Sequence, residues 1–258
     1  LKPDEKPGLA TDLTLVQCQE CRLVQLLDSA PRDYIYRERP YWYQSGVNES
    51  MVKELTDIMA SATKLVNLKP NDVVVDIGSN DGTLLRAYSG VHHRVGFEPS
   101  LLSGISIDEP GKPITVIPNY FSAKDYPFQQ KAKLICCIAM FYDLEDPVQF
   151  SKDVASILDD TGVFIVQMNY LKSMIEQNAF DNIGHEHLCY YTIETLQGVL
   201  KQAGLEVFDV TFNDVNGGSF RSYIGHPGRH IKTERLGMAL FNEQQFFSQP
   251  SVFREFQE

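Results

Sequence analysis

The 258-residue chain has little positive charge, no long hydrophobic run and no cysteine-rich framework. Its 23 Lys and Arg residues are outnumbered by 34 Asp and Glu residues, which gives a net charge of −11. A surface that binds nucleic acid or an anionic membrane needs a basic patch, so the sequence predicts neither partner. The longest apolar run covers residues 134–141 and is too short to cross a bilayer.

The sequence also lacks the features of a secreted protein. It opens with polar and proline-rich residues rather than the apolar segment of a signal peptide. Its five cysteines are an odd number, and Cys136 and Cys137 are adjacent within an apolar run. Both features suit a reducing compartment better than a disulfide scaffold. The sequence therefore predicts a cytoplasmic protein of ordinary globular composition.

The rest of the chain is organised around residues 73–84. Val73 to Ile77 is an apolar, β-branched run that ends at Gly78, which is typical of a buried parallel strand. A short polar turn follows, and a helical pattern begins at Thr83. A strand, a glycine-containing turn and a helix in this order form the nucleotide-binding corner of an open α/β sheet.

The residues of this turn discriminate between cofactors. A dinucleotide turn carries G-x-G-x-x-G, whereas this one has only Gly78 and Gly82, flanked by Asp76 and Asp81. Two carboxylates would repel a pyrophosphate, but they suit the ammonium and hydroxyl groups of S-adenosylmethionine. The next expected strand ends at Glu98, which can accept hydrogen bonds from both hydroxyls of a ribose. We therefore predict S-adenosylmethionine rather than a nicotinamide cofactor; the alternative is that the two aspartates only cap the turn and the helix.

Apolar segments and helical patterns alternate along the chain, which predicts an α/β fold. The fold class is that of a class I methyltransferase, Rossmann-like, with a mostly parallel seven-stranded sheet that ends in an antiparallel hairpin. The expected strands are 73–77, 93–98, 114–117, 133–139, 163–168, 205–213 and 219–225. The expected helices are 47–68, 82–89, 100–106, 147–158 and 192–203, with a further helical segment in 232–258.

The N-terminal segment contains a C-x-x-C motif between two alternating strands. Cys18 and Cys21 form half of a zinc ribbon, because a structural zinc usually needs four ligands and a second such pair. The other cysteines do not have ligand spacing. We expect that the upstream pair is missing from a truncated chain; a hairpin remnant is the alternative. A thioredoxin-like redox motif lacks the βαβ context that it requires.

A polar insertion, residues 178–191, follows the fifth expected strand and contains the run His185-Glu186-His187. It lies after the carboxyl end of a strand, where open α/β folds bind their ligands. The run can supply an acid/base pair and a residue that orients it. Because side chains alternate in an extended chain, we expect one histidine to reach the substrate and the other to be structural. A metal site is a weaker alternative, because no third ligand accompanies the two histidines.

Several motifs together resemble the sugar C-methyltransferases that act on nucleotide-linked deoxy-4-ketohexoses. They are the cysteine pair within 15–26, Tyr43-x-Ser45-Gly46, the turn 76–82, the segment 141–147, His185-Glu186-His187-x-x-Tyr190-Tyr191 and Asn216-Gly217-Gly218-Ser219. The resemblance implies a partial N-terminal zinc-binding lobe in 1–40, a methyltransferase domain in 41–230 and the start of a truncated C-terminal lobe in 231–258.

The resemblance also implies a reaction and a site. The substrate would be a nucleotide-linked 4-ketosugar, methylated at the carbon beside the ketone through an enolate. His187 would be the base, and Glu186 and His185 would position it or polarise the ketone. The cofactor-binding residues would be Tyr43, Ser45, Asp76, Gly78, Asn80, Asp81, Gly82, Glu98, Asn119 and Phe121, and structural zinc would be held by Cys18 and Cys21. The alternatives are a fragment that binds the cofactor but is catalytically incomplete, and a binding module that is not an enzyme. No oligomeric state is predicted.

Overall fold

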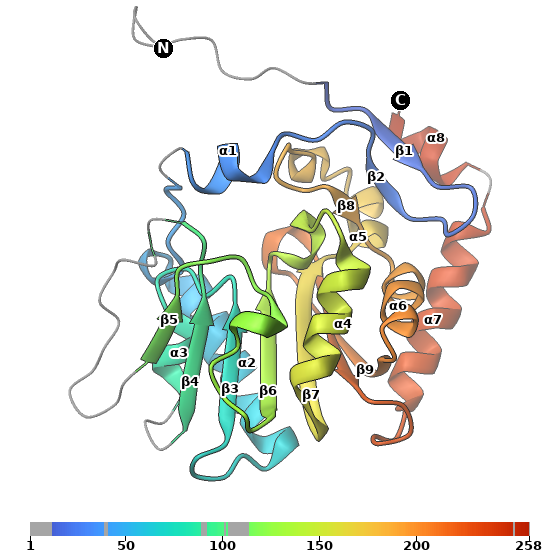
Figure 1. The fold of residues 1–258 in the computed structure, drawn as a ribbon. Helices are drawn as coiled ribbons and strands as arrows, with labels where there is room; N and C mark the ends of the chain where they lie inside the picture. The colour runs from blue at the N-terminus through green and yellow to red at the C-terminus, as the bar shows by residue number, and fades with distance from the viewer. Residues whose placement is uncertain are drawn as a thin grey trace, which may run out of the picture.

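The computed structural model describes residues 12–38, 41–88, 92–100, 102, 114–249 and 251–257. Its centre is a seven-stranded sheet with the strand order β5-β4-β3-β6-β7-β10-β9 (Figure 1). The first five of these strands are parallel, and β10 pairs antiparallel with both β7 and β9. The strands are β3 (Val73–Ile77), β4 (His93–Phe97), β5 (Ile114–Ile117), β6 (Ala132–Ile138), β7 (Leu158–Asn169), β9 (Glu206–Asn213) and β10 (Ser219–Gly225).

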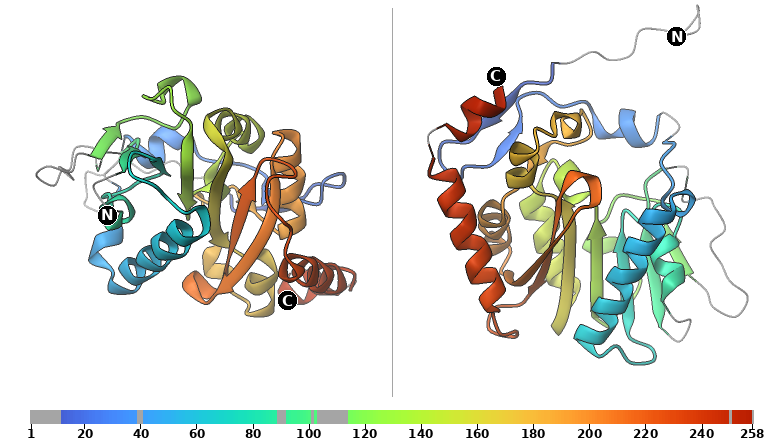
Figure 2. Two further views of the ribbon diagram at one scale, coloured as in Figure 1. Left: turned by 90° about the horizontal axis from the view of Figure 1, so that it is seen from below. Right: turned by 180° about the vertical axis from the view of Figure 1, so that it is seen from behind.

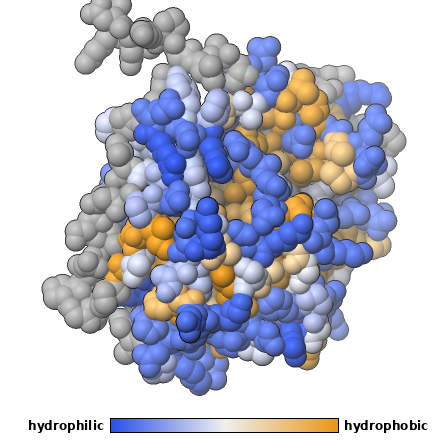
Figure 3. Space-filling model, in the orientation of Figure 1, coloured by the Kyte–Doolittle hydropathy of each residue, from blue (hydrophilic) through white to orange (hydrophobic). Residues whose placement is uncertain are grey.

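Helices cover both faces of this sheet. α2 (Glu49–Val66) and α3 (Thr83–Ala87) lie over one face, in front in the right panel of Figure 2. α4 (Pro147–Ile157) and α6 (Ile193–Gln202) cover the opposite face, and α7 (Glu234–Phe247) packs beside α6 and β9. The outer surface of this second face is mainly hydrophilic, with separate hydrophobic patches (Figure 3). The core consists of two large hydrophobic clusters, one on each face of the sheet: α4 and α6 contribute to the first, and α2 and α3 to the second.

Helix α2 shows how the sequence forms one of these layers. Asn48 caps it by accepting hydrogen bonds from the backbone N–H groups of Ser50 and Met51. Its buried residues recur at helical spacing and are Met51, Leu55, Ile58, Ala62 and Val66. Each large aliphatic side chain buried in this way stabilises the fold by about 1.5–3 kcal/mol.

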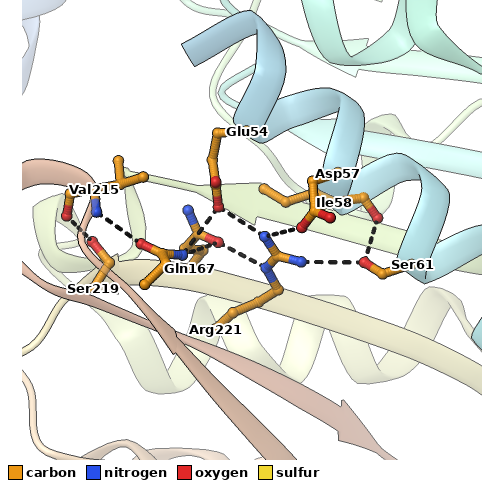
Figure 4. A network of polar contacts seen from close by, with 9 residues as sticks. Glu54, Asp57, Ile58, Ser61, Gln167, Val215, Ser219 and Arg221 are labelled. Atoms are coloured by element: carbon orange, nitrogen blue, oxygen red, sulfur yellow. Dashed lines mark hydrogen bonds and ion pairs between the residues drawn. The ribbon is translucent and has the colours of Figure 1, made fainter. Parts of the chain in front are cut away.

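A buried arginine fastens α2 to the sheet (Figure 4). Arg221 on β10 donates from Nη2 to Glu54 Oε1 at 2.7 Å and to Asp57 Oδ2 at 3.0 Å, both on α2. Its Nε donates to Gln167 Oε1 on β7 at 2.8 Å. The guanidinium therefore joins β7 and β10 to the middle of α2.

Smaller elements lie above the carboxyl ends of the parallel strands, at the top of Figure 1. β1 (Leu15–Gln17) and β2 (Val24–Leu26) form a hairpin, and β2 pairs with β8 (Cys189–Tyr190) of the insertion. α1 (Arg32–Tyr36), α5 (Leu171–Glu176) and α8 (Val252–Gln257) complete this region. The N-terminal segment is thus joined to the insertion that contains the histidines.

The elements agree with the predicted ones except at a few boundaries. The predicted strand 163–168 begins at Leu158 instead, because the chain turns extended there and pairs with Ala132 of β6. The predicted helix 100–106 lies almost wholly outside the described residues. Within the described ranges, no helix is long and apolar enough to cross a membrane.

Candidate functional site

The turn after β3 approaches the rest of the chain so closely that glycine is needed. Gly78 has φ +75°, and a Cβ at this position would lie 3.1 Å from Met140 Cγ. Its backbone N–H donates to the carbonyl of Phe97 at 2.9 Å, as does that of Ser79 at 3.0 Å. Gly82, with φ +77°, then starts α3. These contacts leave an open space above the carboxyl ends of β3, β4 and β6.

That space is a cavity of about 410 Å³, which we call the cofactor cavity. Its volume falls within the range of small-molecule sites, roughly 300–1,000 Å³. Seven of the ten predicted cofactor-binding residues line it, namely Tyr43, Ser45, Asp76, Gly78, Asn80, Glu98 and Phe121. The ring of Phe121 packs edge-on against Phe97 at 5.0 Å, which fixes its position in the cavity wall.

Two carboxyl groups give the cofactor cavity an acidic end. Burial, together with the nearby charges of Glu98 and Asp81, raises the pKa of Asp76 to about 8. Glu98 is held in place, because Oε2 accepts from the backbone N–H of Asn80 and Oε1 from that of Ser100, each at 2.8 Å. A cation would relieve this mutual repulsion, whereas a pyrophosphate would increase it. The carboxyl oxygens of Asp76 and Glu98 are therefore suitable acceptors for the ammonium group and the ribose hydroxyls of S-adenosylmethionine.

Three predicted cofactor residues, Asp81, Gly82 and Asn119, lie outside the cavity lining. Asp81 Oδ1 accepts from the hydroxyl of Thr83 at 2.6 Å, and its Oδ2 accepts from the backbone N–H of Gly46 at 2.8 Å. Asn119 Oδ1 accepts from Arg37 Nη2 at 2.7 Å. The capping alternative thus describes Asp81, while Asp76 faces the cavity.

Asn80 lines the cavity, and its side chain also fastens the segment that covers it. Its Oδ1 accepts from the backbone N–H of Ser45 at 2.9 Å, and its Nδ2 donates to the carbonyl of Tyr43 at 2.9 Å. A side chain at Gly46 would place its Cβ 2.7 Å from Asp81 Oδ2, so this approach also requires glycine. These contacts hold Tyr43 and Ser45, two of the predicted cofactor-binding residues, against the turn.

A second cavity of about 800 Å³ adjoins the first, and we call it the outer cavity. Tyr41, Tyr43 and Ala139 line both cavities. The remaining lining is aromatic, amide and acidic: Tyr34, Trp42, Tyr142, Asn169, Asn182, Asn216, Asp181, Glu186 and His187, with Ile35 and Gly217. The outer cavity therefore brings the His-Glu-His run next to the cofactor cavity.

His187 is oriented for use as a base. Its Nδ1 lies 2.7 Å from the carbonyl oxygen of Asn182. A carbonyl can only accept, so Nδ1 carries the ring proton of the neutral imidazole and Nε2 keeps its lone pair. Tyr142 packs edge-on against the ring at 4.4 Å between centroids. Of the two histidines, this is the one that lines the outer cavity.

His185 does not line the outer cavity, and its Nδ1 is enclosed without a hydrogen-bond partner in the described part of the chain. The expectation that only one histidine faces the cavity agrees with this placement, but its stated reason was wrong. Residues 185–186 form a turn, closed by a hydrogen bond from the His187 N–H to the Gly184 carbonyl at 3.0 Å. The turn, rather than strand alternation, separates the two rings.

Cys18 and Cys21 lie in the turn of the β1–β2 hairpin, and both are free thiols. Hydrogen bonding from the backbone N–H of Cys21 lowers the pKa of the Cys18 thiol. Among the residues that the structure describes, no three His, Cys, Asp or Glu side chains are close enough to hold a metal. A complete zinc ribbon is therefore not formed by this part of the chain.

The cavities are also lined by residues to which the sequence assigned no role, among them Tyr36, Tyr41, Ala139, Tyr142 and Asp143. Tyrosines recur between residues 34 and 43, and 141–147 is one of the quoted motifs. Both patterns indicated that these segments contribute to a site, but neither indicated which of their side chains come together in the fold. Ala139, which lines both cavities, adopts φ +54° directly after β6.

Comparison with known proteins agrees with this geometry. The model of a family described as a methyltransferase domain matches residues 43–210, which contain most of the lining of the cofactor cavity and the histidine run. The chain belongs to this methyltransferase family. The curated C-methyltransferase NovU of Streptomyces niveus is 28% identical to this methyltransferase over 213 residues, which are 80% of the chain and 50% of NovU. The chain thus spans about half the length of this relative.

Solved structures show the same fold. An S-adenosylmethionine-dependent methyltransferase of Clostridium acetobutylicum ATCC 824 matches with a TM-score of 0.54 and 14% identity over 69% of this chain and 92% of its own. The magnesium protoporphyrin IX methyltransferase ChlM of Synechocystis PCC 6803, solved with bound S-adenosylhomocysteine, also gives 0.54 and 14%, over 69% and 88%. The predicted class I, Rossmann-like methyltransferase fold is confirmed.

Proposed function

We propose that this methyltransferase transfers a methyl group to the sugar carbon beside the 4-ketone, C3, of a nucleotide-linked deoxysugar. The observation that carries the proposal is the placement of His187. Its ring, with Nε2 free to accept a proton, faces a cavity that shares three lining residues with the cofactor cavity. A base beside a methyl donor is the arrangement that transfer to carbon requires. The likeness to a protein named C-methyltransferase supports it.

The cofactor cavity fits S-adenosylmethionine, which supplies an electrophilic methyl group when bound. Asp76 and Glu98 would receive its polar groups, and Phe121 would border its adenine. Asn80 and Ser45 would complete the wall that separates it from solvent. The protein contributes by holding the methyl donor and the sugar carbon in line, which can supply much of the rate.

The outer cavity would hold the ketosugar. His187 Nε2 removes the proton beside the ketone, and the C–H electron pair becomes the enolate. The enolate carbon then forms the new bond to the methyl carbon as the bond from that carbon to sulfur breaks, and the ketone is restored. Glu186, which lines the same cavity, would stabilise the imidazolium that forms. His185 would affect this site indirectly, by stabilising the turn at residues 185–186 that positions His187.

The lining indicates which part of the substrate enters. Asn169, Asn182 and Asn216 offer amide donors and acceptors that suit sugar oxygens. Described residues of the lining include two acids and neither lysine nor arginine. We therefore place the ketosugar ring in the outer cavity and the diphosphate outside it.

Deuterium exchange separates the base from its neighbours. Enzyme in heavy water with a nucleotide-linked 4-keto-6-deoxyhexose and S-adenosylhomocysteine should exchange the hydrogen beside the ketone, because that step needs no methyl transfer. His187→Asn should slow exchange and methylation together by about 10²–10⁴-fold and leave the affinity for S-adenosylhomocysteine nearly intact. His185→Asn is the matched control and should be milder. Loss of exchange in His185→Asn alone would reverse the two assignments.

A base other than the histidines is the remaining possibility if both variants still exchange. Tyr190 would then be the candidate, because its hydroxyl is enclosed without a partner in the described chain. Burial raises the pKa of Tyr190 to about 12, which makes it a poor base near neutral pH. Methylation that proceeds without exchange in any variant would overturn the enolate route.

A second candidate function follows from the length of the match. Because the chain spans about half of NovU, it could bind the cofactor and still be catalytically incomplete. Calorimetric binding of S-adenosylhomocysteine together with no exchange on any 4-ketosugar of a panel would favour this function. Failure to bind S-adenosylhomocysteine at all would favour a binding module.

We also propose that Cys18 and Cys21 are two of the ligands of a structural zinc in a longer N-terminal lobe. The hairpin and the lowered pKa of Cys18 support this, since a thiolate is the form that binds zinc. Metal analysis of this chain should find less than one zinc per chain. A stoichiometric zinc would mean that other ligands complete the site.

A further inference from the structure

Asp143 lies where the cofactor cavity meets the outer cavity. It ends the 3₁₀-helix η4 (Phe141–Asp143), which follows β6, and it lines the cofactor cavity together with Tyr41, Tyr43 and Ala139. Those three residues also line the outer cavity. The preceding residue, Tyr142, lines the outer cavity and packs against the ring of His187. Asp143 thus lines the cofactor cavity directly after the residue that packs against the base.

The two oxygens of Asp143 have different environments. Oδ2 accepts a hydrogen bond from the hydroxyl of Tyr36 at 3.0 Å. Oδ1 is enclosed and has no hydrogen-bond partner in the part of the chain that the structure describes. A carboxylate would leave half of its charge on this unpaired oxygen, which is costly in an enclosed position. A neutral carboxylic acid instead accepts from Tyr36 at Oδ2 and carries its proton on Oδ1.

The surroundings favour the neutral form. Burial raises the pKa of the Asp143 carboxyl well above its usual range, the hydrogen bond from Tyr36 lowers it, and the charge of Glu186 raises it. Arg32 lines the same cavity, but its side chain pairs with Glu145 at 3.9 Å. The proton on Oδ1 has no acceptor within the described structure, so its hydrogen-bonding capacity is unused there.

We propose that Asp143 is a further catalytic residue, which donates a hydrogen bond from Oδ1 to the oxygen of the substrate enolate. This role rests on the proposed function. While His187 Nε2 takes the C–H proton, negative charge develops on the ketone oxygen, and a neutral donor in a water-excluded site stabilises that charge. The Asp143 proton is shared with the enolate oxygen and stays on Oδ1, so a single proton moves, from carbon to His187. Tyr36 positions Asp143 by holding Oδ2.

The test compares two substitutions of Asp143 in the heavy-water exchange reaction with S-adenosylhomocysteine. Asp143→Ala removes the donor and should slow exchange by about 10²–10³-fold. Asp143→Asn keeps an N–H donor in nearly the same shape and should slow it by about tenfold. Asp160→Asn, at an exposed carboxylate beside Arg229, is the matched control and should exchange at the wild-type rate. Circular dichroism shows whether each variant folds. If Asp143→Ala does not fold, the exchange rates of Asp143→Asn and Tyr36→Phe test the role of Asp143 instead.

Two readouts separate a donor from a structural residue. Exchange by the wild type should decline at high pH as Asp143 ionises, and Asp143→Asn should lack this alkaline decline. Infrared difference spectra of wild type against Asp143→Asn at neutral pH should contain the carbonyl stretch of a carboxylic acid. A carboxylate band in its place, or wild-type exchange by Asp143→Ala, overturns the role of Asp143 while the proposed function stands. No exchange and no methylation by the wild type itself overturns the proposed function and this role with it.

Discussion

The buried carboxyl of Asp76 should make the unliganded methyltransferase less stable as the pH rises. Burial, Glu98 and Asp81 raise its pKa from the ordinary 3.8 to about 8 in the folded state. Below about pH 4 the group is neutral in the folded and the unfolded chain and costs nothing. As the pH rises from about 4 through about 8, the unfolded chain releases its proton first, so stability is progressively lost.

The size of the effect follows from the shift. A displacement of about 4 pKa units, at about 1.4 kcal/mol each, corresponds to a full cost of about 6 kcal/mol above both pKa values. Between about pH 5 and about pH 8.5, the free energy of unfolding should therefore fall by roughly 3–5 kcal/mol because of this group. Asp76→Asn removes the titration, so the difference in unfolding free energy between the variant and the wild type should grow by that amount.

Urea unfolding followed by circular dichroism at these two pH values measures the difference. Asp160→Asn, at an exposed carboxylate, is the matched control and should show no such growth. Asp76→Asn should have the opposite effect on ligand binding. Calorimetry with S-adenosylhomocysteine at about pH 8.5, where Asp76 of the wild type is ionised, should find binding weakened by about 1.5–3 kcal/mol, because the ligand loses a charged partner. A stability difference that is the same at both pH values would refute the conclusion that Asp76 is a buried, strongly shifted acid.

Two further predictions concern the other polar groups. Glu98→Ala should weaken S-adenosylhomocysteine binding by roughly 1–3 kcal/mol in calorimetry, because it removes the expected acceptor of the ribose hydroxyls and the carboxylate that accepts from the N–H groups of Asn80 and Ser100; unchanged affinity would contradict the assignment of Glu98 to the cofactor. Arg221→Met should lower the free energy of unfolding by about 3–5 kcal/mol in urea, because Glu54 would stay behind without its partner (Figure 4). In that variant the ligand affinity should be retained, and a stability close to that of the wild type would show that water replaces the guanidinium.

The order of secondary-structure elements could be predicted because it depends on local patterns. Val73–Ile77 is apolar except for Asp76 and is buried over its whole length, as a strand covered on both faces must be. Pro147 at the start of α4 and the Asn216-Gly217-Gly218 turn before β10 also act within a few residues. Such signals indicated the sheet, its closing hairpin and the position of the cofactor turn.

The direction in which each side chain points was decided by contacts between distant residues. Asp76 and Asp81 flank the same turn, yet Asp81 faces Gly46 and Thr83 while Asp76 faces the cavity. The turn at 185–186 likewise separates two histidines that the sequence could not distinguish. In both cases a hydrogen bond fixes one of the several side-chain directions that the sequence allows.

The sequence by itself determined the alternation of strands and helices, the glycines of the cofactor turn and the acids that suit a cationic cofactor, because each depends on residues that are neighbours in the chain. Only the tertiary structure brought β2 against β8, and Tyr36 against Asp143, 107 positions apart. These pairings depend on which surfaces the folded sheet leaves open above its strand ends. The junction between the two cavities, with the free nitrogen of His187 on one side and the unpaired oxygen of Asp143 on the other, exists only once those distant segments have packed together.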